Sequence, residues 1–236
     1  RALVADLQVT RAVALNGAYF ASPPGEDALV ITGPPRSGTT LLLELLACDE
    51  ETWRPLTGPE ALVPGAVESD RAVLTSALAG QALAFQATKE AHYEEVDGPT
   101  ECRSLLENAG APYVFWWVLG LTGPLDAWLA DDGRRRSDYA FYRQELAAVR
   151  LAAGRADARR WLLKDPCHLF SLDELFEALP KARVVWLHRD PATVSASLCA
   201  LLSKVWRLLY RAEASTSPPR FNDAVVTYLG KLLDAG

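Results

Sequence analysis

A turn rich in glycine, proline and serine joins an apolar segment to a leucine-rich one at residues 33–40. The preceding residues 28–32 have the composition of a buried strand, and the following residues 41–46 favour a helix. A turn in this position leaves several backbone N–H groups unpaired at the positive end of a helix dipole. The sequence therefore predicts a binding site for a phosphate or sulfate group.

The spacing of Gly33 and Gly38 is that of a P-loop, but Thr39 stands where nucleotide triphosphatases carry their phosphate-binding lysine. The missing lysine weakens the interpretation of this turn as a triphosphate site. Arg36 supplies a positive charge inside the turn. We therefore expect the turn to bind a single 5′-phosphate group.

Two more apolar segments are followed by a basic residue and then by Asp-Pro. Residues 161–164 end at Lys164, and residues 183–188 precede Arg189. The second segment has the continuous apolar pattern of a parallel strand buried on both faces. Because ligands bind at the carboxyl ends of the strands in an open α/β sheet, we expect Arg36, Lys164 and Arg189 to face one crevice.

These three segments resemble the PAPS-dependent sulfotransferases, where PAPS is 3′-phosphoadenosine 5′-phosphosulfate, and in particular the bacterial and tyrosylprotein-type members. The resemblance is carried by Pro35-Arg36-Ser37-Gly38-Thr39-Thr40, by Lys164-Asp165-Pro166, and by Arg189 with Ser197 eight residues later. It implies that Pro35, Arg36, Ser37, Gly38, Thr39 and Thr40 bind the 5′-phosphosulfate. It also implies that Arg189 and Ser197 bind the 3′-phosphate.

The resemblance implies a fold and an activity. The fold would be α/β, with a central parallel sheet flanked by helices as in the P-loop nucleotide triphosphatases, and residues 1–236 would form a single sulfotransferase domain. The enzyme would transfer a sulfuryl group from PAPS to a hydroxyl, or to an amine, of a small acceptor, and would release 3′-phosphoadenosine 5′-phosphate (PAP). By analogy with phosphoryl transfer, this chemistry needs positioning and charge stabilisation more than covalent catalysis, and we expect no metal.

The aromatic segment 113–119 is a core segment or the lining of a pocket for a hydrophobic acceptor.

Arg36 and the N–H groups of the turn suit the negative charge that builds on the bridging oxygen in the transition state. Lys164 resembles the lysine that reaches the transferring group in the family.

A general base must accept the proton of the acceptor hydroxyl. Glu60 lies where related sulfotransferases carry a catalytic glutamate, although Pro59 replaces the aromatic residue found before it in several relatives. A helix cap is an equally good interpretation of Glu60. His168, close to Lys164, is the second candidate, and a buried structural histidine is its alternative interpretation. His92 and Glu101 are weaker candidates.

The composition limits the partners of the protein. A net charge of −6 and a pI of about 5.2 argue against general binding to nucleic acids or membrane surfaces. The four cysteines contain no Cys-x-x-Cys pair, which argues against a zinc site and disulfides. We find neither a signal peptide nor an apolar run of about 20 residues that would span a membrane, so we expect a cytoplasmic protein. The sequence leaves the oligomeric state and the acceptor open.

Two other functions stay open. A P-loop kinase or nucleotide triphosphatase would need a lysine after Gly38 and an aspartate that holds Mg²⁺ at a strand end. A catalytically inactive nucleotide-binding protein would not need a cation at each strand end. The absence of methionine leads us to expect that some residues are missing between the motifs, so the spacings within motifs carry more weight than the distances between them.

Beyond the motifs, the pattern predicts helices at residues 2–20, 69–93, 137–153, 171–179 and 191–212, and a loop at residues 49–66. The basic run Arg134-Arg135-Arg136 follows Asp131-Asp132-Gly133 and is expected to be a solvated loop.

Overall fold

The computed structural model describes residues 2–21, 27–66, 72–76, 97–113, 121–154, 157–210 and 219–235. At its centre lies a four-stranded sheet with the strand order β2-β3-β1-β4. The strands are β1 (Ala28–Thr32), β2 (Trp53–Pro55), β3 (Arg160–Lys164) and β4 (Arg183–Trp186). Every neighbouring pair is parallel. The prediction of a central parallel sheet is therefore confirmed.

The register aligns the carboxyl ends of β1, β3 and β4. Ile31 of β1 lies opposite Lys164 of β3, and Thr32 of β1 lies opposite Trp186 of β4. Each strand therefore leaves the sheet at nearly the same level. The loops that follow β1, β3 and β4 share one edge of the sheet, as expected for ligand-binding loops of an α/β fold.

Side-chain alternation along the strands divides the apolar core into two layers. Ile31 and Leu162 point to one face and pack with Leu43 of α3 (Thr39–Ala47). Val30 and Leu163 point to the other face and join a much larger apolar cluster. That cluster also contains side chains from α6 (Arg103–Ala109), α9 (Asp132–Ala153), the 3₁₀ helix η2 (Pro166–Phe170), α10 (Leu172–Ala178) and α12 (Pro219–Ala235).

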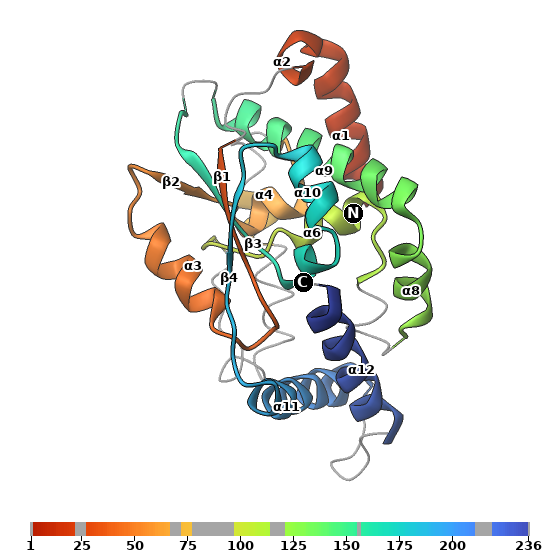
Figure 1. Cartoon of the computed structure of the whole chain (residues 1–236). Coiled ribbons are helices and arrows are strands. Elements are labelled where there is room, and N and C mark those ends of the chain that lie inside the picture. Colours follow the sequence, from red (N-terminus) through yellow and green to blue (C-terminus); the bar gives the residue numbers. More distant parts are fainter. Residues whose placement is uncertain are drawn as a thin grey trace.

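Figure 1 shows α3 on one side of the sheet and α6, α9 and α10 on the other. The remaining helices are α1 (Ala2–Leu15), α2 (Gly17–Ala21), α4 (Gly58–Leu62), α8 (Gly123–Leu129) and α11 (Pro191–Tyr210). α1 packs against α6 and α9, and α11 packs against α12. Within the described ranges, no helix combines the length and the hydropathy needed to cross a membrane.

Two sequence-based predictions of elements differ from the structure. The expected loop at 49–66 contains the edge strand β2 and the short helix α4, both too short to show a clear period. The helix expected at 137–153 begins five residues earlier, because the Asp131 side chain accepts a hydrogen bond from the Arg134 backbone N–H and caps it. Most of the helix expected at 69–93 lies outside the described residues.

The expected solvated loop at Arg134-Arg135-Arg136 is therefore a prediction that the structure corrects. All three arginines lie in the first turns of α9. Arg135 pairs with Glu174 of α10 at 3.0 Å, and Arg136 pairs with Glu177 at 3.2 Å. Arg135 and Arg136 thus join α9 to α10, and Arg134 donates to the Gly110 carbonyl oxygen after α6.

Candidate functional site

The loop after β1 has a backbone that only a few residue types tolerate. Gly33 and Gly38 have φ values of +141° and +100°, and Arg36 has a φ of +71°. A Cβ atom on Gly33 would lie 2.4 Å from the carbonyl oxygen of Leu187. Glycine is required there because the chain that leaves β4 crosses directly over the loop. This close approach brings the residues before Arg189 next to the predicted phosphate loop.

The loop ends at α3 in a form suited to an anion. Gly38 precedes the helix and provides no side-chain cap, so the first N–H groups of α3 are not capped from that position. The Ser37 hydroxyl is buried and has no hydrogen-bond partner in the part of the chain that the structure describes. Pro35 and Thr39 are buried, and Thr40 is half-buried. Backbone amides and a hydroxyl at a helix start are the donors that a phosphate or sulfate group uses.

Two arginines close this loop against the start of α11. The Arg36 Nε–H donates to Ser197 Oγ at 3.1 Å, across 161 residues of sequence. Arg189 Nη1 donates to the Arg36 carbonyl oxygen at 2.9 Å. Asp190 accepts from the Thr193 backbone N–H at 2.8 Å and thereby caps α11. The two halves of the predicted nucleotide site therefore meet in one place.

Lys164 ends β3 in a buried position. Lys164 is two residues after Leu162, so its side chain leaves the sheet on the same face, which α3 covers. Only 2% of that side chain is exposed. Its Nζ pairs with Glu101 Oε1 at 2.6 Å. Glu101 also pairs with Arg103 through its other oxygen, at 3.1 Å. Sequence reasoning ranked Glu101 low, because nothing local links two residues 63 positions apart.

Asp165 follows Lys164 and caps η2. One of its oxygens accepts from the Cys167 backbone N–H at 2.7 Å, and the other is buried without a hydrogen-bond partner among the described residues. Burial, assisted by the negative charge of Glu101 and opposed by Arg103, raises the pKa of Asp165 to about 6. A carboxylate whose pKa is raised holds its proton more tightly than an ordinary aspartate.

Glu60 makes the contacts of a helix cap. Its Oε2 accepts from the Thr57 backbone N–H at 3.0 Å, and its Oε1 pairs with Arg54 Nη2 at 2.7 Å. Arg54 is itself buried, lies 4.4 Å from the centre of the Trp161 ring, and pairs with Asp157 at 3.0 Å. Both oxygens of Glu60 are thus engaged with its own segment of the chain.

His168 lies in the core below this edge of the sheet. Its ring is fully buried, with Nδ1 2.8 Å from Tyr139 Oη and Nε2 3.1 Å from Cys102 Sγ. Burial lowers the pKa of His168 to about 3, so the ring is neutral. The sequence contained no sign of the Tyr139 and Cys102 contacts.

The structure does not describe His92, and it describes only the first residue of the aromatic segment 113–119. Tyr113 is 1% exposed and packs edge to face with Trp128, with ring centres 5.3 Å apart. At Tyr113 the apolar segment therefore belongs to the core.

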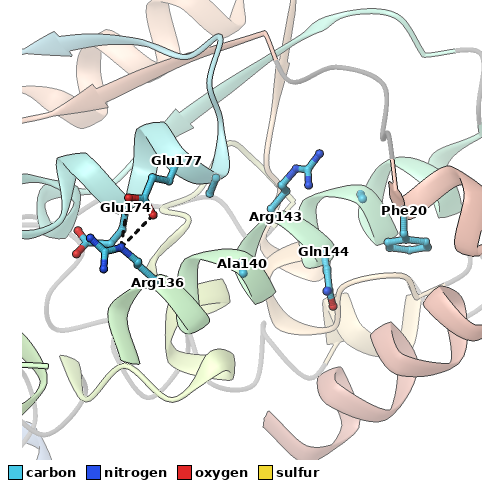
Figure 2. Close-up of a pocket in the computed structure, with 9 residues that line it drawn as sticks. Phe20, Arg136, Ala140, Arg143, Gln144, Glu174 and Glu177 are labelled. Atoms are coloured by element: carbon cyan, nitrogen blue, oxygen red, sulfur yellow. Dashed lines mark hydrogen bonds and ion pairs between the residues drawn. The ribbon is translucent and has the colours of Figure 1, made fainter. Parts of the chain in front are cut away.

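A hollow of about 280 Å³ lies away from these residues, against α9 and α10. Figure 2 shows it with the Arg136–Glu177 ion pair on one side and Phe20 on the other. It contains none of the predicted site residues. In the described part of the chain, no group of three or more His, Cys, Asp or Glu side chains is arranged to hold a metal.

Comparison with known proteins identifies the family of this chain. The model of the Sulfotransferase family matches residues 28–229, and the chain belongs to this family. The structure is similar to sulfotransferase STF1 from Mycobacterium tuberculosis, with a TM-score of 0.74 and 24% identity over 99% of this chain and 64% of that one. It is also similar to sulfotransferase STF9 from Mycobacterium avium, with a TM-score of 0.70 and 22% identity over 97% of this chain and 59% of that one.

These two likenesses establish the fold. The chain spans roughly three fifths of the length of each of the two structures. No curated protein matches the chain.

Proposed function

We propose that this protein transfers a sulfuryl group from PAPS to a hydroxyl, or an amine, of a small hydrophobic acceptor and releases PAP. One observation carries the proposal: Arg36 reaches Ser197 while Arg189 reaches the backbone of Arg36. The two guanidinium groups, the loop that precedes α3 and the first turns of α11 are thereby gathered beside one another. A ligand with phosphate groups at both ends of an adenosine suits such an arrangement.

The phosphate loop supports the 5′ end of this proposal. Its residues offer the Ser37 hydroxyl, which has no partner among the described residues, the start of α3 without a side-chain cap from Gly38, and the guanidinium of Arg36. We assign Pro35, Arg36, Ser37, Gly38, Thr39 and Thr40 to the 5′-phosphosulfate. Bound PAPS would supply the sulfuryl group, and these donors would stabilise negative charge on the oxygen that bridges sulfur and phosphorus. We assign Arg189 and Ser197 to the 3′-phosphate.

Lys164 is proposed as the cation that acts on the transferring group. Its ammonium group lies on the same face of the sheet as α3, and Glu101 neutralises it at 2.6 Å. A buried lysine held by one carboxylate is fixed in place before any substrate arrives. We propose no metal.

Glu101 is the general base that the geometry supports best. It is the carboxylate in direct contact with Lys164, whereas Glu60 binds Arg54 and the backbone of its own helix. His168 is fully buried, and both of its ring nitrogens are engaged. A base must come within hydrogen-bonding reach of the acceptor hydroxyl. The burial of His168 opposes that role more strongly than the contacts of Glu60 do.

Calorimetric titration with PAP, 5′-AMP and ATP tests the proposal. We expect PAP to bind more tightly than 5′-AMP, because the two differ only in the 3′-phosphate. Arg189→Ala should weaken PAP binding about 10- to 100-fold, the loss expected for a charge-assisted contact, and should change 5′-AMP binding by less than about 3-fold. Equal weakening of both ligands would contradict the assignment of Arg189.

The alternatives predict different titrations. A kinase or nucleotide triphosphatase would prefer ATP with Mg²⁺ over PAP. An inactive nucleotide-binding protein would bind PAP but would transfer no sulfate from ³⁵S-labelled PAPS to any of a panel of hydroxyl and amine acceptors. The panel also defines the acceptor class.

A further inference from the structure

We propose that His168 is a positioning residue, whose neutral ring relays three hydrogen bonds from Tyr139 to the end of β3 and thereby fixes Glu101 beside Lys164. The inference rests on the proposed function, because it gives Glu101 and Lys164 their roles. Its members Tyr139, His168 and Cys102 belong to neither of the two proposed phosphate-binding segments. The relay joins α9, η2, the start of α6 and β3.

The direction of each hydrogen bond follows from the acceptor at the end of the relay. Cys102 Sγ lies 3.4 Å from the Lys164 carbonyl oxygen, which can only accept. Burial raises the pKa of Cys102 to about 12, so the sulfur keeps its proton and can donate it to that carbonyl. The sulfur then accepts from Nε2 of His168. The neutral ring therefore carries its proton on Nε2.

The other nitrogen of the ring is then an acceptor for Tyr139. Burial raises the pKa of Tyr139 well above its ordinary value, so the phenol keeps its proton and donates it to Nδ1. In the opposite arrangement Nδ1 would donate to Tyr139, and the phenol proton would need another acceptor. The structure shows no such acceptor among the described residues, and leaving a buried donor unpaired is unfavourable. The relay therefore has one favoured direction.

The relay ends at the backbone of Lys164, which forms the proposed catalytic pair with Glu101. The Cys102 backbone N–H also donates to the Lys164 carbonyl oxygen, at 3.0 Å, so Cys102 holds this carbonyl twice. Glu101 immediately precedes Cys102, and its carboxylate meets the Lys164 ammonium at 2.6 Å. The backbone and the side chain of Lys164 are thus tied to consecutive residues. A shift of Cys102 would move the carboxylate of Glu101 relative to Lys164.

The surroundings of the ring agree with a fixed orientation. Tyr139 and Tyr142, both from α9, lie with ring centres 5.8 Å and 5.7 Å from that of His168. Both rings therefore pack against the imidazole and restrict its rotation.

Nuclear magnetic resonance of ¹⁵N-histidine-labelled full-length protein tests the relay without any substrate. The resonances of His168 are those that disappear in His168→Gln. We expect the Nε2–H tautomer, and we expect no titration of this ring between pH 5 and pH 8. An Nδ1–H tautomer, or a ring that titrates near pH 6.5, would overturn the relay.

Kinetics of matched variants test the positioning. Tyr139→Phe and Cys102→Ala each break one link and should lower kcat for sulfuryl transfer from PAPS to 4-nitrophenol about 10-fold, with the Kd for PAP changed by less than about 2-fold. Cys102→Ser keeps a donor and an acceptor and should stay within about 3-fold of the wild type. Tyr113→Phe is the control, because its buried hydroxyl has no partner among the described residues.

The outcomes of these experiments distinguish failure of the positioning role from failure of the proposed function. Equal losses of kcat in Tyr139→Phe and Tyr113→Phe, or weaker PAP binding in Tyr139→Phe, would refute positioning and indicate a general structural effect. Wild-type protein that neither binds PAP nor transfers sulfate would refute the proposed function, whatever the tautomer. Loss of kcat in both relay variants with unchanged PAP binding supports both proposals.

Discussion

At the scale of single residues, the carboxylates at the sheet edge differ in what they contact. Glu101 pairs with Lys164, whose side chain is 2% exposed, and Glu60 pairs with Arg54 and caps α4. A buried ammonium group needs such a partner, because an unpaired charge in the core is costly. Glu101 therefore has a structural duty in addition to its proposed catalytic role.

Substitution of these two glutamates distinguishes the candidates for the base. Glu101→Gln should lower kcat about 100-fold or more, because the amide cannot take the proton of the acceptor. Glu60→Gln should leave kcat within about 3-fold and should lower the free energy of unfolding by about 1 kcal/mol, since it weakens a cap and an ion pair. Steady-state kinetics and urea denaturation measure both. A large loss of kcat in Glu60→Gln alone would return the role of base to Glu60.

At the scale of elements, η2 combines a buried acid with a buried base. Asp165 caps this helix with a pKa raised to about 6, and His168 lies in its middle with a pKa lowered to about 3. Unfolding returns both groups to their ordinary values of 3.8 and 6.5. Between pH 6.5 and pH 4 the unfolded chain therefore protonates the imidazole that the folded protein keeps neutral. In the same range the folded protein protonates the carboxylate that the unfolded chain keeps charged.

These two effects on stability have opposite signs, which single variants separate. Between pH 7 and pH 5, the shifted pKa of His168 should lower the free energy of unfolding by about 2 kcal/mol. The shifted pKa of Asp165 should raise it by about 1 kcal/mol over the same range. Asp165→Asn should therefore lose more stability in acid than the wild type, and His168→Gln should gain stability in acid. Urea denaturation at the two pH values measures the slopes. All three proteins share the other carboxylates, so an identical pH dependence would show that neither group contributes.

The loop after β1 and the strand β4 also act as one unit. Gly33 admits the carbonyl of Leu187, and this contact positions the residues that lead to Arg189. The chain that follows β4 therefore contacts the predicted phosphate loop and holds it in place. Its geometry does not depend on its own hydrogen bonds alone, of which Ser37 to Pro34 is one.

At the scale of the whole molecule, one apolar cluster connects distant parts of the chain. It contains Val30 of β1, Leu106 of α6, Leu163 of β3 and Leu232 of α12. The final described helix is therefore packed into the same core as the strands that carry the site. The single domain expected for residues 1–236 stays a prediction, and the contribution of α12 to stability tests it.

Two adjacent leucines of α12 provide that test. Leu232 is fully buried, whereas Leu233 is 38% exposed. Leu232→Ala should lower the free energy of unfolding by about 2–5 kcal/mol in one cooperative transition, and Leu233→Ala by less than about 1 kcal/mol. Thermal and urea unfolding, followed by both circular dichroism and tryptophan fluorescence, measure this. Separate transitions for the two probes, or equal effects of the two substitutions, would contradict a shared core.

The sequence alone determined the class of fold, the glycine-containing loop after β1 and the basic residues at the strand ends. These features are contiguous: an apolar run, a turn with Gly33, Arg36 and Gly38, and then a helix are written in neighbouring residues. The family match to residues 28–229 agrees with them. Local pattern sufficed because each of these elements depends on backbone preferences and burial that a short segment carries by itself.

Only the tertiary structure decided which side chains meet. The contacts of Arg36 with Ser197, and of Lys164 with Glu101, join segments 161 and 63 residues apart. They depend on the strand order and on the register, which bring the ends of β1, β3 and β4 to one edge of the sheet. The surroundings of His168 likewise include Tyr139 and Tyr142 of α9, whose rings lie against the imidazole. No local sequence pattern predicts these side-chain contacts, because each contact depends on the packing of elements that are remote in sequence.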